Sequence, residues 1–387
     1  MAPKLPRLLV SHLGPIQSAD ITFGDLTVLV GPQASGKSIL FQTLKLALDG
    51  KAISSTLALR GIGWGEKEAF TELFYGEGMS SLRNRNTRIS WQGRAVSLAR
   101  EYPVEKAGSQ APVPSSVYYI PAHRVMAIKN GWPRHFSDYS PDDPYVLREF
   151  SEKLRGFVEL FWQRGDKAIF PPRGELATGT RKLLQEQLFG NYQLTQEVRG
   201  AQKRLVLKRG SEAPLPYIAW STGQREFGPL LLGCLSVLLP ARLEQADKTW
   251  VVLEEPEMGL HPRAITAVLF LVLDLLQCGF RVCLSTHSPH VLDLLWALRV
   301  FHERKAGPKW VLKLFDVEAT SANTRVAASI LQKAIKVYYL DRQESKSVDI
   351  SRLDADSASV HETSWGGLTE WSARAADVVA ELVANQR

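Results

Sequence analysis

One segment constrains the fold of this 387-residue chain more than any other. The continuous apolar run Leu26–Val30 leads directly into Gly-Pro-Gln-Ala-Ser-Gly-Lys-Ser at positions 31–38. Such a run is typical of a strand buried on both faces, as in parallel sheets covered by helices. From Ser38 to Leu48 the apolar residues are spaced as one helical face, and Gly50 follows. The segment therefore predicts an α/β fold with a phosphate-binding glycine loop at the sheet edge.

The glycine loop, residues 31–38, has the residue types that hold a nucleotide triphosphate. Gly31 and Gly36 let backbone N–H groups turn toward phosphate oxygens, and Lys37 brings a positive charge to the β and γ phosphates. The hydroxyl of Ser38 is expected to reach Mg²⁺, and the following helix directs its positive dipole end to the same phosphates. We therefore predict ATP and Mg²⁺ as the ligands. The predicted nucleotide-binding residues of this segment are Gly31, Pro32, Ser35, Gly36, Lys37, Ser38 and Ile39.

A second apolar strand, residues 249–253, ends in two adjacent carboxylates. It delivers Glu254 and Glu255 to the carboxyl edge of the predicted sheet, where α/β folds bind their ligands. Glu254 is expected to hold the water shell of Mg²⁺, and Glu255 to orient or deprotonate the attacking water. An ordinary acidic turn after a strand is the alternative interpretation of this pair.

Two further segments suit a site that closes over nucleotide. Ser221, Gly223 and Gln224 precede an apolar helix, where a hydroxyl and a glycine can form an anion site. A plain helix cap is the other interpretation of this signature segment, residues 221–226. His287 follows the predicted strand 281–284 and can hydrogen-bond the γ-phosphate. A structural histidine is its alternative.

Composition restricts the cellular setting but not the chemistry. A net charge of +7 and a pI near 9.2 are compatible with a polyanion site or with a merely basic solvated surface. Three cysteines without a CxxC pair predict a reducing compartment and no disulfide framework. The most apolar run, residues 267–276, contains Asp274 and is shorter than the ~18 residues of a membrane helix. We expect a cytoplasmic protein without a membrane partner.

In order, these motifs resemble the ABC-type heads of the SMC, RecF and overcoming-lysogenization-defect (OLD) group of ATPases. The resemblance covers roughly residues 5–50 and 215–295 and is closest to the stand-alone prokaryotic OLD-like proteins. It implies an ATP-dependent head dimer, in which Ser221 and Gly223 of one copy cover the ATP held by Lys37 of the other. It also implies that Arg124 lies near the nucleotide, in a Pro-x-x-Arg element.

The sequence departs from the wider ABC pattern at two positions. Thr222 stands where glycine is common, and Glu254 stands where aspartate is common. The side chain of Glu254 is one methylene longer than that of an aspartate, so its carboxylate reaches farther from the backbone at the predicted metal site.

The predicted architecture is a P-loop α/β head with an antiparallel β lobe, an inserted helical arm and a C-terminal α/β extension. We predict an N-terminal lobe over 1–125, a helical insertion over 126–203, a C-terminal lobe over 204–305 and the extension over 306–387. Within the insertion, periodicity predicts helices over 145–161 and 180–196. A hairpin is predicted from strands at 204–209 and 216–220.

Two biological roles remain open from the sequence. In the first, the ATPase regulates a separate effector, such as a nuclease or toxin, in anti-phage defence. Asp354 and Asp356 form a D-x-D, but we interpret them as an exposed acidic turn rather than a fused nuclease.

The second role is RecF-like DNA maintenance with DNA-stimulated hydrolysis. It would use a groove formed by the basic residues Arg83, Arg85, Arg88, Lys203, Arg204, Lys208 and Arg209. A transporter subunit is disfavoured by the long gap between Ser38 and Ser221.

Overall fold

The fold is described from a computed structural model of the whole chain. The structure describes residues 5–64, 67–96, 113–140, 143–165, 168–172, 176–243, 250–354, 357, 359–363, 365 and 367–385.

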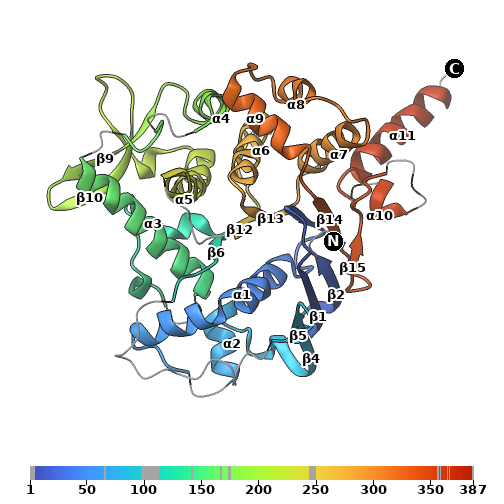
Figure 1. Cartoon of the computed structure of the whole chain (residues 1–387), viewed down its shortest axis with the longest axis horizontal. Helices are drawn as coiled ribbons and strands as arrows, with labels where there is room; N and C mark the ends of the chain where they lie inside the picture. The colour runs from blue at the N-terminus through green and yellow to red at the C-terminus, as the bar shows by residue number, and fades with distance from the viewer. Residues whose placement is uncertain are drawn as a thin grey trace.

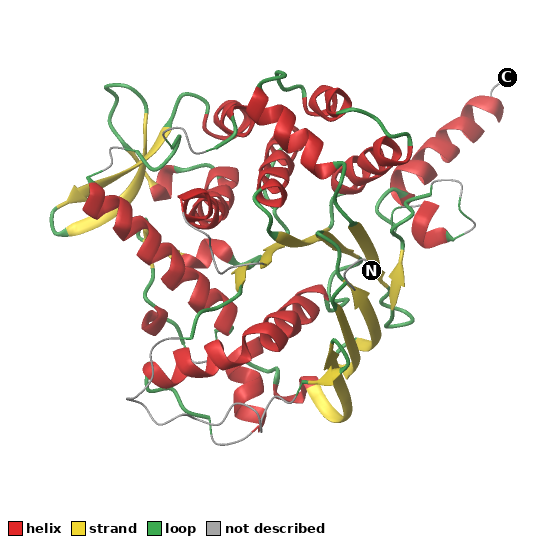
Figure 2. Ribbon diagram, in the orientation of Figure 1, coloured by secondary structure: helices red, strands yellow, loops and turns green. Residues whose placement is uncertain are grey.

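A six-stranded sheet forms the centre of the molecule, as Figure 2 shows. Its strand order is β15-β14-β3-β13-β12-β6, and every neighbouring pair is parallel except β14 with β15. Its strands are β3 (Leu26–Val30), β6 (Val117–Ile120), β12 (Trp250–Glu254), β13 (Arg281–Thr286), β14 (Ile335–Leu340) and β15 (Ser347–Asp349). The predicted α/β fold with a parallel central sheet is confirmed.

Helices cover both faces of this sheet, and the alternation of side chains along the strands explains why. Val28 and Val30 of β3 join one buried cluster, whereas Leu29 between them joins the other. In Figure 1 α1 lies on one side of the strands and α5 and α6 on the other. The helices are α1 (Lys37–Leu59), α2 (Lys67–Tyr75), α3 (Tyr145–Arg164), α4 (Thr178–Leu184), α5 (Thr222–Leu243), α6 (Pro262–Gln277), α7 (Pro289–Glu303), α8 (Pro308–Phe315), α9 (Ser321–Ile330), α10 (Val360–Thr363) and α11 (Glu370–Asn385).

An antiparallel lobe packs on the α1 side, as predicted. Its order is β2-β1-β4-β5, and its apolar residues belong to the same buried cluster as Leu29 and α1. The strands are β1 (Arg7–Leu13), β2 (Ile16–Thr22), β4 (Arg83–Trp91) and β5 (Arg94–Ala95).

The segment between the lobe and the signature helix differs from the prediction in two places. Helix α4 and a following π turn end at Gly190, whose φ of 57° is in the left-handed region, so residues 193–196 are not helical. They begin strand β9 (Gln193–Arg199), which pairs with β10 (Gln202–Lys208) across Gly200. The hairpin is therefore formed by β9 and β10. The predicted second strand shrinks to β11 (Leu215–Pro216) and a 3-10 turn, and β7 (Ile128–Lys129) with β8 (Trp132–Pro133) forms a separate small pair.

A buried ion cluster joins the helix of the glycine loop to the inserted segment. α1 has a kink at Asp49, whose carboxylate accepts hydrogen bonds from Lys45 at 2.8 Å and from the backbone N–H of Ser116 at 2.8 Å. Lys45 also pairs with Glu149 of α3 at 3.0 Å. Because these charges are paired and hydrogen-bonded, α1, β6 and α3 are held together at one place.

The last part of the chain is integral to the head. Strand β14 lies directly beside β3, pairing Ile335 with Leu26 and Tyr339 with Val30. Helix α11 instead projects from the body in Figure 1, and Trp371 is 75% exposed. The boundaries predicted for the four domains stay predictions.

Candidate functional site

The predicted site residues lie at the carboxyl ends of adjacent parallel strands. β3 leads into Gly31, β13 into His287 and β12 into Glu255, and β13 lies between the other two strands. Parallel strands bring their carboxyl ends to one edge of a sheet. This topology places the glycine loop, the acidic loop (residues 254–257) and the His287 loop (residues 285–289) next to one another.

The glycines of the loop are required by backbone shape and by close packing. Gly31 and Gly36 have φ values of 149° and 95°, which side-chain-bearing residues rarely adopt. A Cβ atom on Gly31 would lie 2.6 Å from the carbonyl oxygen of Leu340 in β14, and one on Gly36 would lie 2.7 Å from Ile16. The loop is therefore seated between β14 and the turn joining β1 to β2.

Lys37 begins α1 and folds back across the loop. Its ammonium donates hydrogen bonds to the carbonyl oxygens of Gly31 and Pro32, each at 2.8 Å. Burial lowers the pKa of Lys37 to about 8, and the nearby carboxylate of Glu255 acts in the opposite direction. The charge is thus held in a partly desolvated place, where it interacts more strongly with an anion than it would in water.

The remaining residues predicted from this segment have different surroundings. Ser35 is buried, and within the described chain its hydroxyl oxygen has no hydrogen-bond partner, so it can bind a ligand oxygen. Ile39 lies in the first turn of α1, close to Gly14 of the antiparallel lobe, and its carbonyl accepts from Thr43. Pro32 contributes its carbonyl to Lys37, and we place Ile39 as a packing residue of the loop.

Ser38 and Glu254 form the predicted metal pair. Glu254 ends β12 with 2% of its surface exposed, and its Oε2 accepts the N–H of Ala122 at 3.1 Å. Burial raises the pKa of Glu254, and a hydrogen bond from the Ser38 hydroxyl acts in the opposite direction. A buried carboxylate beside a hydroxyl is a donor set that suits Mg²⁺, which favours hard oxygen ligands and keeps several waters. The residues present therefore fit the ion.

Glu255 and His287 follow the neighbouring strands β12 and β13, and their side chains face one another. His287 Nε2 lies 3.2 Å from Glu255 Oε1, and both side chains are partly exposed. The hydrogen bond from His287 lowers the pKa of Glu255, as does the positive charge of Lys37. Glu255 also has a φ of 43°, a strained conformation that is common at functional sites. A negatively charged Glu255 is thus directed to the space between Lys37 and His287.

Glu257 had no role in the sequence-based prediction, although this residue positions the His287 loop. Its Oε1 accepts hydrogen bonds from the Thr286 hydroxyl at 2.6 Å and from the backbone N–H of His287 at 2.7 Å. The Thr286 hydroxyl in turn accepts the N–H of Ser288 at 2.9 Å. In the sequence, the position of Glu257 three residues after Glu254 was the only sign of this role. Its contact with the His287 loop follows from the parallel register of β12 and β13.

Arg124 is a buried residue that holds the acidic loop in position, a role called the Arg124 brace below. Its side chain is fully buried and donates to the carbonyl oxygens of Glu226 at 3.0 Å, Glu254 at 2.9 Å and Glu255 at 3.1 Å. Burial lowers the pKa of Arg124, and the carboxylate of Glu226 acts in the opposite direction. Its guanidinium is occupied by backbone atoms, so we assign it to positioning the loops rather than to contacting a nucleotide.

The signature segment forms the start of α5. The N–H of Gln224 donates to the Ser221 hydroxyl at 3.2 Å, and the Gln224 side chain accepts from the Ser221 N–H at 3.0 Å, a reciprocal cap. Ser221 is exposed. A Cβ atom on Gly223 would lie 2.9 Å from the carbonyl oxygen of Gly259, which explains the glycine by close packing on the loop after Glu257. Capping and an anion site are both compatible with this geometry.

Two features outside the loops concern the cysteines and the helices. Cys234 and Cys283 are buried, and Cys278 is half-buried. None of the helices that the structure describes has the length and apolar character needed to cross a membrane.

One family model matches the chain, over residues 137–293, and is described as "AAA domain, putative AbiEii toxin, Type IV TA system". It covers most of the inserted segment, the signature segment, the acidic loop and the His287 loop, but less than half of the chain. No curated protein matches the chain.

Solved structures similar to the chain include two SMC heads and a part of an ABC transporter complex. An SMC head bound to the C-terminal winged-helix domain of ScpA has 10% identity and a TM-score of 0.43, covering 90% of this chain and 97% of that one. The protein cbiO1 of Clostridium perfringens, part of the ABC transporter complex cbiONQ, has 12% identity and a TM-score of 0.36, with 88% and 86% covered. The SMC head domain of Thermotoga maritima has 14% identity and a TM-score of 0.31, with 75% and 91% covered.

These TM-scores are below 0.5, so the assignment depends on the chain's own sheet order, its loops and the matched segment. The glycine loop, the two carboxylates at the end of β12 and the histidine after β13 meet at one sheet edge. Together with the family match, they support a P-loop nucleotide-binding domain that is similar, over residues 137–293, to the AAA-domain family.

Proposed function

We propose that this protein binds and hydrolyses ATP with Mg²⁺, and that ATP-dependent closure of two heads regulates a separate effector protein. The observation that carries the ATPase part is the meeting of Lys37, Glu254, Glu255 and His287 at one edge of the sheet. The dimer and the effector are inferred from the signature segment and from the description of the matched family.

The residues divide the reaction between binding and proton transfer. Lys37 exchanges its bonds to the Gly31 and Pro32 carbonyls for bonds to the β and γ phosphates. Ser38 and Glu254 would hold Mg²⁺, which supplies neutralisation of phosphate charge. Glu255 orients the attacking water and accepts its proton, and the lowered pKa keeps this carboxylate ionised at neutral pH. His287 donates a hydrogen bond to the γ-phosphate.

Closure of two heads would complete the site. Ser221 and Gly223 stand at the exposed N-terminus of α5, a place where helix dipole and free N–H groups favour an anion. In the proposed dimer this end covers the γ-phosphate bound to the partner. Arg124 donates hydrogen bonds both to the start of α5 and to the acidic loop. A movement of α5 on dimerisation would therefore also move the acidic loop.

An effector of the toxin or nuclease type is the partner we propose, in a cytoplasmic anti-phage system. The toxin wording of the matched family supports this role. The DNA-maintenance alternative has less support, because several residues of its basic groove have local partners. Arg204 pairs with Glu197, and Arg209 pairs with Glu212 at 2.7 Å. Asp356, one half of the D-x-D, lies outside the described residues, and Asp354 is exposed.

The test uses Glu255→Gln, which removes the base and retains size and hydrogen bonding. The variant should bind ATP like the wild type, lose phosphate release and shift to a dimer in light scattering with ATP and Mg²⁺. The matched control is Glu212→Gln on the exposed β10–β11 connection, which should behave as wild type. Normal turnover by the Glu255→Gln variant would reject the role of the base. A Glu255→Gln protein that stays monomeric with bound ATP would reject the dimer.

The effector part needs a separate measurement. Tagged Glu255→Gln protein expressed from its native locus should copurify one protein in stoichiometric amount, identified by mass spectrometry. Recovery of the chain with DNA and no protein partner would reject the effector and support the maintenance role.

A further inference from the structure

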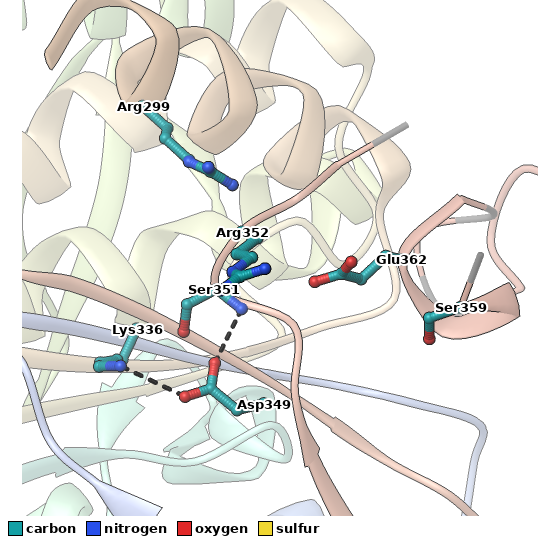
Figure 3. A pocket seen from close by; sticks show the side chains of 7 residues that line it. All are labelled: Arg299, Lys336, Asp349, Ser351, Arg352, Ser359 and Glu362. Atoms are coloured by element: carbon teal, nitrogen blue, oxygen red, sulfur yellow. Dashed lines mark hydrogen bonds and ion pairs between the residues drawn. The ribbon is translucent and has the colours of Figure 1, made fainter. Parts of the chain in front are cut away.

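A polar pocket lies between α7, the edge of the sheet and α10, away from the loops described above. It has a volume of about 500 Å³, which is within the range of small-molecule sites. The residues that line it are Arg299, Lys336, Asp349, Ser351, Arg352, Ser359 and Glu362. Figure 3 shows the side chains of Arg299, Arg352 and Glu362 pointing toward a common space.

Part of the charge in this pocket is already paired. Lys336 Nζ lies 3.2 Å from Asp349 Oδ2, and the other oxygen of Asp349 accepts the N–H of Ser351 at 2.9 Å. Arg299 donates from Nε and Nη2 to Glu303 Oε1 at 2.8 and 2.7 Å. These groups shape the pocket and leave it little net charge.

Two charged groups, Arg352 and Glu362, remain for a ligand beside Arg299. Arg299 Nη1 is buried, and none of the described residues accepts a hydrogen bond from it. Glu362 is only 9% exposed, and its carboxylate has no hydrogen bond or ion pair within the described parts of the chain. Arg352 is exposed at the pocket and has no ion pair with Glu362 there. The carboxylate of Glu362 lines the pocket, where this charge can pair with a cationic group of a ligand.

The balance of charges decides the class of ligand. A plain anion would pair with Arg352 and be repelled by Glu362, and a plain cation would have the reverse problem. A small zwitterion satisfies both groups, with its carboxylate on Arg352 and its ammonium on Glu362. We propose that this pocket binds a free α-amino acid or a close zwitterionic analogue.

The pocket is connected to the nucleotide edge by two elements. α7 starts at Pro289, directly after the His287 loop, and carries Arg299. α10 carries Glu362 and also His361, whose Nε2 lies 3.5 Å from Asp341 Oδ2 and whose ring stacks on Tyr339 at 4.7 Å. Asp341 follows Leu340, the residue that contacts Gly31. Occupancy of the pocket therefore changes the ATP hydrolysis rate, a consequence that rests on the proposed function, whereas binding itself does not.

The binding test is thermal unfolding of the full chain without nucleotide, with each of the twenty free amino acids at millimolar concentration. At least one should raise the melting temperature of the wild type by about 1–2 °C or more. Its N-acetyl and C-terminal amide derivatives, each with one charge of the pair removed, should give no shift. An equal shift with the N-acetyl derivative would overturn the zwitterion assignment in favour of a plain anion site, and no shift with any amino acid would overturn the pocket.

Variants connect the binding to the named residues. Glu362→Gln and Arg352→Gln should weaken the dissociation constant measured by calorimetry at least about tenfold, because each removes one charge-assisted contact. Glu77→Gln, an exposed acid in a distant turn, is the matched control and should bind normally. Unchanged affinity in Glu362→Gln with wild-type stability would contradict the assignment.

A final measurement separates the pocket from the ATPase. Lys37→Ala should retain the amino-acid shift even though it does not bind ATP. In the wild type, the amino acid should change the rate of phosphate release at saturating ATP. An unchanged rate would overturn the coupling and leave the pocket, whereas a shift lost in Lys37→Ala would show that the ligand binds at the glycine loop instead.

Discussion

The hydrogen bonds of Glu257 to the His287 loop allow the effect of a Glu257 substitution on kcat to be predicted. Its Oε1 accepts two short hydrogen bonds, from Thr286 at 2.6 Å and from His287 at 2.7 Å. Hydrogen bonds to a charged group contribute about 1.5–3 kcal/mol each, and neutral ones about 1 kcal/mol. Glu257→Gln keeps an acceptor and loses the charge, so it should cost about 1–3 kcal/mol in the placement of His287. If that cost appears in the transition state, kcat falls by about 5- to 150-fold.

The assay is steady-state phosphate release, combined with equilibrium binding of a fluorescent ATP analogue. Because Glu257 acts through the loop, kcat should fall while the dissociation constant of ATP changes less than about threefold. Thr286→Val removes one of the two donors and should lower kcat in the same way. The double variant should show a coupling of about 1 kcal/mol or more, since the two side chains share one bond. Additive effects of the two changes, within about 0.3 kcal/mol, would refute the positioning role.

The same loops lead to three further predictions. Burial lowers the pKa of Lys37 to about 8, so its positive charge is lost as the pH rises through that value. The dissociation constant of ATP should therefore rise about tenfold between pH 7 and 9. A dissociation constant that stays constant over this range would contradict the prediction. Ser221→Arg should leave ATP binding intact and block dimerisation and hydrolysis; normal turnover in the variant would remove the composite site. Arg124→Met leaves the carbonyls of Glu226, Glu254 and Glu255 without their donor, so it should destabilise the fold by about 3–5 kcal/mol in urea denaturation, and a cost below about 1 kcal/mol would show that the brace is dispensable.

The central strands and their motifs were predictable because each strand is a short apolar run followed by its functional residue. Leu26–Val30 is a strand with the predicted bounds. Strand β9 was missed because its sequence, QLTQEVR, has no simple alternation, and the turn at Gly190 rather than the strand residues ends the preceding helix. The place of β14 beside β3 depends on a long-range pairing that no local pattern encodes.

The sequence was enough to predict which residues form the site, but not which of them contact one another. Lys37, Glu254 and Glu255 are recognisable from their spacing after strands. The partner of Glu257 depends on the register between β12 and β13, which places Glu254 opposite Ser285. The position of Arg124 was inferred from resemblance, and only its three carbonyl contacts distinguish a brace from a ligand-binding residue.

The pairing of β3 has a consequence for how the chain folds during synthesis. Leu26 pairs with Val282 on one side and with Ile335 on the other, so both edges of the strand stay unpaired until late in translation. Contacts so distant in sequence slow folding, and exposed strand edges favour association with other chains. The glycine loop therefore acquires its final shape only after β14, residues 335–340, has left the ribosome, and nascent chains that stop before β14 are expected to depend on chaperones.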